Sequence, residues 1–169
     1  MSHHCCQESS SHEDEHKCHK HHRCCINNVA VTGLSPFPCP PTSNDPMGTG
    51  AVFPNSEAEP SISVGHNPKC KDKPMVVVCY QQDRYNHSGG CNADYMRISF
   101  DGGHEFKKPI ALPNVTCYGG PYERTSNPHV AVTPNGEIYF AGLPFNIVGN
   151  AQSGLTIAKY NVKHHTFTY

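Results

Sequence analysis

The stretch that decides the fold occupies residues 99–106 and reads Ser-Phe-Asp-Gly-Gly-His-Glu-Phe. It fits the pattern Ser-x-Asp-x-Gly-x-x-aromatic. Asp101 can accept hydrogen bonds from backbone N–H groups of its own turn, and Gly103 can adopt a left-handed conformation without a Cβ clash. The pattern therefore predicts a tight turn between two strands, with Phe106 folded back onto the sheet.

Short segments of alternating apolar residues lie before this turn. Ile62 and Val64 alternate with serines, and Met96 and Ile98 alternate with polar residues, as in half-buried strands. Residues 75–80 form a continuous apolar run, which is typical of a strand covered on both faces. We therefore expect strands on the amino-terminal side of the turn.

The carboxyl-terminal half shows the same pattern and contains a hairpin. The Pro-Asn-Gly-Glu sequence at residues 134–137 favours a tight turn between residues 130–132 and 138–141. Two more extended segments are predicted at residues 155–158 and 167–169. Residues 60–64 are echoed by residues 128–132 at an offset of 68, and recurrence of a four-strand unit is typical of propeller blades.

Composition divides the chain into three parts. The chain has 169 residues with 14 Gly and 15 Pro, which disfavours helices and predicts an all-β fold. Residues 1–25 include 12 His or Cys and no apolar residue besides Met1 and the cysteines, so we expect a disordered tail. Residues 26–58 are predicted to be a Pro-rich irregular connector with one short strand at residues 28–32. Residues 59–169 are predicted to form an incomplete set of blades.

The turn at residues 99–106 resembles the Asp box of bacterial-neuraminidase repeat proteins, the sialidase-like six-bladed β-propellers. Residues 27–169 as a whole resemble the amino-terminal stretch of such a protein, in particular through the segments 55–60, 80–85 and 127–136. In that family the box is a structural turn, so the resemblance implies a fold and a structural role for Ser99, Asp101, Gly103 and Phe106. A second copy at residues 160–167 keeps the aromatic residue and loses Ser, Asp and Gly.

The resemblance implies a glycan-related function, of the exo-sialidase type of glycoside hydrolase. Members of the family bind the substrate carboxylate with three arginines and use an Asp acid/base and a Tyr-Glu pair. This chain has no Arg-Ile-Pro segment, and its four arginines are Arg23, Arg84, Arg97 and Arg124. About two blades are also fewer than a closed propeller needs. We therefore expect a propeller fragment that is inactive alone and requires no cofactor.

The candidate site residues lie near strand ends that would face the centre of a propeller. Asp83, Arg84 and Glu59 are weak catalytic candidates. The alternative is structural, with Asp83 and Arg84 as a loop ion pair and Glu59 as a cap before Pro60. The candidate glycan-binding residues are Glu57, Glu59, Asp83, Arg84, Tyr85 and Arg124.

The ten cysteines suggest two further features. Half of them lie in the first 25 residues beside seven histidines. Such side chains suit zinc, although no Cys-x2-Cys pair is present. The tail residues that could bind zinc are His16, Cys18, His19, His21, His22, Cys24 and Cys25. In addition, the resemblance implies a disulfide between Cys39 and Cys117, with two buried thiols as the alternative in a reducing compartment.

Net charge and hydropathy exclude some classes of binding partner. The formal net charge is −1 at pH 7, so we expect neither nucleic acid nor an acidic membrane as a partner. We see no apolar run long enough to span a bilayer and no secretory signal, and the compartment stays open. A second hypothesis for function is a non-enzymatic interaction module whose open blade edges associate with a second copy or with a partner that completes the propeller.

Overall fold

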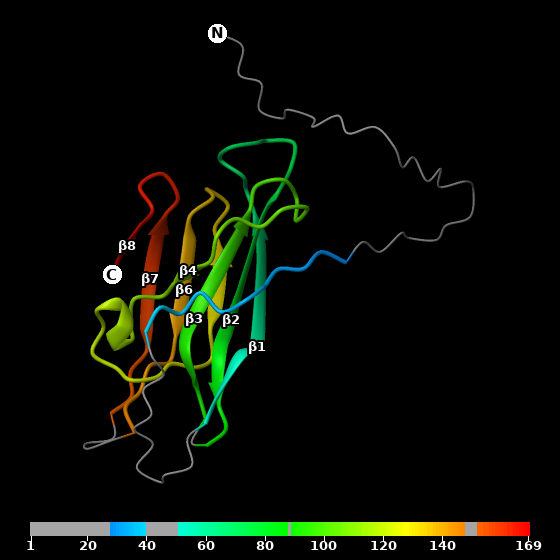
Figure 1. The fold of residues 1–169 in the computed structure, drawn as a ribbon. Coiled ribbons are helices and arrows are strands. Elements are labelled where there is room, and N and C mark those ends of the chain that lie inside the picture. Colours follow the sequence, from blue (N-terminus) through cyan, green and yellow to red (C-terminus); the bar gives the residue numbers. More distant parts are fainter. Residues whose placement is uncertain (1–27, 40–50, 88, 148–151) are drawn as a thin grey trace.

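The chain folds into two four-stranded antiparallel sheets in a computed structural model that describes residues 28–39, 51–87, 89–147 and 152–169. In each sheet the strands are adjacent in sequence order, as in propeller blades (Figure 1). The first sheet contains β1 (Val52–Gly65), β2 (Met75–Tyr85), β3 (Cys91–Ser99) and β4 (Ile110–Ala111), and the second contains β5 (His129–Val132), β6 (Ile138–Gly142), β7 (Thr156–Asn161) and β8 (Thr166–Thr168). The fold is therefore all-β as predicted, and the short 3-10 helix η1 (Thr116–Tyr118) is the one helical element of the described residues.

The two sheets pack face to face around one apolar core. Met75, Val77 and Met96 of the first sheet meet Ile138 and Phe140 of the second, and all five are fully buried. Their alternation along each strand places them on the inner faces. Ile98 also points toward the other sheet, so the inner face of each sheet is covered by the other one.

The internal repeat places the first strands of the two sheets side by side. The Ser61 hydroxyl lies 3.4 Å from Nδ1 of His129, which is the equivalent residue 68 positions later. Two residues further along β1, the Ser63 hydroxyl accepts a hydrogen bond from the Val132 N–H at 2.9 Å. The sequence repeat therefore corresponds to a structural repeat of two similar units.

The connector predicted at residues 26–58 is shorter than expected. Strand β1 begins at Val52 and includes Pro54, one of the prolines on which the connector was predicted, as well as Pro60. It accommodates both prolines because its pairing with β2 is interrupted between Phe53 and Glu57 and again between Ala58 and Ser61. Irregularities of this kind are the places where a strand tolerates proline.

Residues 28–39 form a strap over the outer face of the first sheet. The strand expected at residues 28–32 is not formed. Phe37 instead packs on a small cluster that includes Tyr80 and Tyr95, and its ring lies edge-on to Tyr118 at 6.0 Å. The strap thus covers one part of a sheet face that would otherwise be open.

The tail at residues 1–25 lies outside the described residues, and so do its zinc candidates. Within the described part, no helix is long and apolar enough to cross a membrane.

Candidate functional site

The turn at residues 99–106 connects β3 to β4 and is closed by side chains of its own. The Asp101 carboxylate accepts hydrogen bonds from the Ser99 hydroxyl at 2.6 Å and from the backbone N–H groups of His104 and Glu105 at 3.0 and 3.1 Å. Burial tends to raise the pKa of Asp101, but these hydrogen bonds outweigh it and lower the pKa. Gly103 has a φ of 99°, a conformation in which a Cβ would be strained. The turn is a rigid structural element, remote from the candidate glycan-binding residues.

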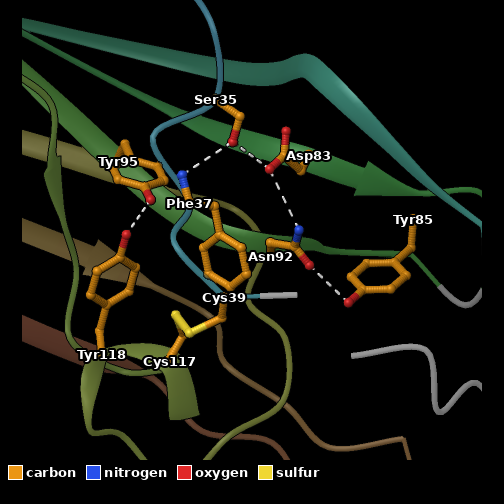
Figure 2. Close-up of a disulfide and its surroundings, with 9 residues drawn as sticks. All are labelled: Ser35, Phe37, Cys39, Asp83, Tyr85, Asn92, Tyr95, Cys117 and Tyr118. Carbon is orange, nitrogen blue, oxygen red and sulfur yellow. Dashed lines mark hydrogen bonds between the residues drawn. A yellow bond between two sulfur atoms is a disulfide. The ribbon is translucent and has the colours of Figure 1, made fainter. Parts of the chain in front are cut away.

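Asp83 is the centre of a buried hydrogen-bond network. Its carboxylate accepts hydrogen bonds from the Ser35 hydroxyl at 2.5 Å and from the Asn55 N–H at 2.8 Å. Figure 2 shows the same network continuing through Asn92 to the Tyr85 hydroxyl. Asp83 therefore fixes the strap and the irregular part of β1 to the first sheet. Among the described residues no ion pair joins this carboxylate to Arg84, whose exposed side chain lies at the rim.

Two of the predicted binding residues have structural roles instead. Arg124 is 1% exposed, stacks on the Tyr85 ring at 3.4 Å from its centroid, and donates to the backbone carbonyls of His87 and Gly89. Tyr85 is also buried. Neither side chain can contact a surface ligand in this conformation, which corrects the expectation that they bind a glycan.

Glu57 and Glu59 remain exposed, and amide groups orient both. The Glu59 carboxylate accepts from the Gln81 side chain at 2.6 Å and from the Asn127 N–H at 3.0 Å, which joins it to the second sheet. Glu57 accepts more weakly from Gln82 at 3.4 Å. We call this group of Glu57, Glu59, Gln81, Gln82 and Asn127 the carboxylate end. It is a set of positioned acceptors and donors at the junction of the two sheets.

The backbone around the carboxylate end is strained. Five described residues other than glycine have a positive φ, and four of them belong to this hydrogen-bonded region: Asn55 at 61°, Glu59 at 50°, Asp83 at 61° and Asn127 at 51°. Asn and Asp tolerate this conformation, but Glu59 pays a larger steric cost. Strain of this kind concentrates at functional sites, where the surrounding structure maintains it.

Gln81 provides a further sign of an incomplete polar site. It is fully buried, and its amide nitrogen donates to both Glu59 and the Ser126 hydroxyl. Its carbonyl oxygen has no hydrogen-bond partner among the described residues. A buried acceptor left unpaired is costly, so a donor from water or a ligand would stabilise it.

Sequence reasoning did not identify Gln81, Gln82 and Asn127 as site residues. The one available signal was the pair of glutamines that interrupts the apolar run of β2. Buried amides at such a place are unusual and require hydrogen-bond partners. Those partners come from strands distant in sequence, which is why sequence reasoning selected the neighbouring charged residues instead.

The three arginines within the described residues do not converge on one site. Arg84 is exposed at the rim, Arg124 is buried beside Tyr85, and Arg97 lies on the outer face of β3 beside the Tyr80 hydroxyl. An arginine triad that could hold a substrate carboxylate is therefore not assembled in this part of the chain. Nor do the described residues contain a group of three His, Cys, Asp or Glu side chains that could hold a metal.

A disulfide joins Cys39 to Cys117, at the end of the strap (Figure 2). It ties the strap to η1, where the Tyr118 hydroxyl is hydrogen-bonded to that of Tyr95. Cys79 and Cys91, by contrast, are buried thiols, and burial raises the pKa of Cys79 to about 12. Neither has the lowered pKa of a reactive cysteine.

Comparison with known proteins gives one structural match. No protein-family model matches the sequence, and no curated protein matches it significantly. Among solved structures, the chain is similar to one from work on the GH130 family of mannoside phosphorylases, which contains glycoside hydrolases that target β-1,2 mannosidic linkages in Candida mannan. Identity is 20% and the TM-score is 0.43, and the similarity covers 85% of this chain but 42% of that chain. The chain thus spans less than half the length of that protein.

Proposed function

We propose that this chain forms two blades of a glycan-binding, glycosidase-related β-propeller and that its carboxylate end binds the hydroxyl groups of a neutral sugar. The observation that carries the proposal is the exposed but immobilised carboxylate of Glu59, held by Gln81 and by the Asn127 N–H at the junction of the sheets. Charge-assisted hydrogen bonds from sugar hydroxyls to such a carboxylate are strong and directional. The carbonyl of Gln81 is buried and does not reach the surface, so the role of Gln81 is to hold the Glu59 carboxylate in place.

The charge of this end favours a neutral sugar over a sialoside. Glu57 and Glu59 present two exposed carboxylates, and Arg84 is the exposed cation beside them. A sialic acid carboxylate would be repelled, and the arginines that would receive it are dispersed. We therefore propose that this chain binds a neutral sugar and does not hydrolyse sialosides.

The experiment compares lactose with sialyllactose by isothermal titration calorimetry. We expect lactose to bind more tightly, and Glu59→Gln to weaken its binding by about ten- to a hundredfold, because one charge-assisted hydrogen bond contributes about 1.5–3 kcal/mol. Glu105→Gln is the matched control, since that carboxylate is exposed at the turn of residues 99–106 and pairs with Lys107. Tighter binding of sialyllactose, or release of a fluorophore from a sialoside, would contradict the proposal.

A non-enzymatic assembly role is the second candidate, favoured by two exposed apolar faces. On the outer face of the first sheet Ile62 is 65% and Val64 is 56% exposed. On the outer face of the second sheet Leu155 is 70% and Ile157 is 55% exposed. The two exposed faces are the two outer sides of the packed sheets. In a propeller, such faces pack against further blades.

A further inference from the structure

The lysines of the described residues are gathered at one end of the molecule. They lie in the hairpin connections β1–β2, β3–β4 and β7–β8, or close to the end of β7, and all of these open toward the same end (Figure 1). The seven lysines are Lys69, Lys71, Lys73, Lys107, Lys108, Lys159 and Lys163. We call this region the lysine end. It lies opposite the carboxylate end.

Charge is therefore separated along the molecule although the whole chain is nearly neutral. The lysine end carries four carboxylates against its seven lysines, namely Asp72, Asp101, Glu105 and Glu137. Two of these are already paired, Glu105 with Lys107 and Glu137 with Lys159. The net charge of −1 thus conceals a local positive field, which can attract an anionic partner over a distance of about one Debye length.

A cavity of about 450 Å³ opens at the lysine end, between the β1–β2 connection and the second sheet. Lys69, Lys159 and Lys163 lie around it, together with Glu137, whose carboxylate pairs with Lys159. Tyr160, Val162 and Pro68 form an apolar wall. Lys69 also lies over the Phe100 ring, with Nζ at 4.0 Å from its centroid. The volume falls in the range of small-ligand sites, and ammonium groups beside an apolar wall suit a ring that carries an acidic substituent.

We propose that the lysine end binds an acidic polysaccharide, with one carboxylated or sulfated sugar unit in this cavity. This site is separate from the neutral-sugar site proposed at the carboxylate end and does not depend on it. The composition of the surface favours a polysaccharide over nucleic acid. All cations of this end are lysines, which act as point charges. Of its described aromatic rings, Phe100, Phe106, Tyr160 and Phe167 are buried or half-buried, and Tyr139 beside Lys159 is 37% exposed, which leaves no row of exposed rings for stacking successive bases.

The test measures binding of the chain to immobilised heparin and polygalacturonate, with uncharged dextran and a short DNA duplex as comparisons. We expect both acidic polysaccharides to bind and dextran not to bind. Raising the NaCl concentration from about 50 to about 200 mM should weaken binding by about tenfold or more, since each lysine contact is ionic.

Two pairs of substitutions localise the site. Lys69→Gln with Lys163→Gln removes two charges at the cavity, and we expect binding to fall by about tenfold. The second pair is Lys71→Gln with Lys163→Gln. Both side chains are exposed, so their replacement does not disturb packing, and we expect binding to weaken here as well. Arg84→Gln removes an exposed cation at the opposite end and should leave binding unchanged.

Three outcomes would overturn the inference. These are no binding of either acidic polysaccharide, an equal loss of binding in Arg84→Gln, and binding of duplex DNA as tight as that of the polysaccharides. Glu59→Gln should leave this binding unchanged while it weakens lactose binding, so failure of one site is distinguished from failure of the other.

Discussion

At the scale of single residues, Asp101 and Asp83 show how the hydrogen bonds of a carboxylate can hold a fold together. Asp101 closes a local turn, and its partners lie within five positions in sequence, so its role was predictable from the pattern of residues 99–106. Asp83 binds Ser35 and Asn55, which lie 48 and 28 positions away. No local sequence pattern predicts such distant partners. The charged pair Asp83 and Arg84 was therefore interpreted as part of a catalytic or glycan-binding site.

Replacement of Asp101 tests the turn. We expect Asp101→Ala to lower the free energy of unfolding by about 1–2 kcal/mol, because the backbone N–H groups of His104 and Glu105 lose their acceptor. Urea unfolding measures the change as a lower midpoint. Asp72→Ala, an exposed carboxylate in the β1–β2 connection, is the control and should leave the midpoint in place.

Asp94 gives a pH dependence that a substitution can isolate. Burial raises its pKa to about 7, against hydrogen bonds from Thr125 and Cys91 that lower it. Because the folded pKa lies above the unfolded value, the stabilising contribution of Asp94 is complete below about pH 4 and is lost as the pH rises through about 7. The difference in unfolding free energy between the wild type and Asp94→Asn should therefore decline between these pH values. A difference that is flat over this range would show that Asp94 titrates normally.

At the scale of elements, the sequence predicted most strands and missed the departures from regularity. The apolar segments located β5 and β6 closely and parts of β3 and β7, although β3 is buried on both faces. Strand β1 was shortened in the prediction because its prolines and bulges break the period of two. The strap at residues 28–39 has the apolar content of a strand but packs through Phe37 rather than through backbone pairing, a distinction that only the tertiary structure makes.

The disulfide should hold the strap in place. Cys39 and Cys117 are 78 residues apart, and closing a loop of that length restricts the unfolded chain by about 4 kcal/mol in the chain-entropy account. We expect Cys39→Ser to lower the guanidinium midpoint under oxidising conditions. The wild type with reductant should unfold at the midpoint of the variant, and an unchanged midpoint in both would show that the strap contributes no stability.

At the scale of the whole molecule, two open apolar faces make association the expected behaviour. The outer face of one sheet can pack on the outer face of the other sheet in a second copy, which extends the stack of sheets beyond the contact of the two inner faces within the chain. A few hundred Å² of apolar surface at roughly 25 cal/mol per Å² amounts to several kcal/mol. We therefore expect the chain to self-associate.

Light scattering over a concentration series measures this association. The mass should rise with concentration in the wild type and much less in Ile157→Lys, which places a charge on the outer face of the second sheet. Leu34→Lys is the control, because Leu34 is 85% exposed on the strap and belongs to neither face. A monomer at all concentrations would mean that these faces stay open to water.

The position of the disulfide also bears on biosynthesis. Both of its cysteines precede β5, so the bond can form as soon as residue 117 has left the ribosome, before any strand of the second sheet has emerged. A nascent chain at that point would already have its strap locked onto the first sheet, yet its inner face, with Met75 and Val77, would still lack a cover. Until β7 emerges, this exposed apolar face makes the nascent chain a substrate for chaperone binding.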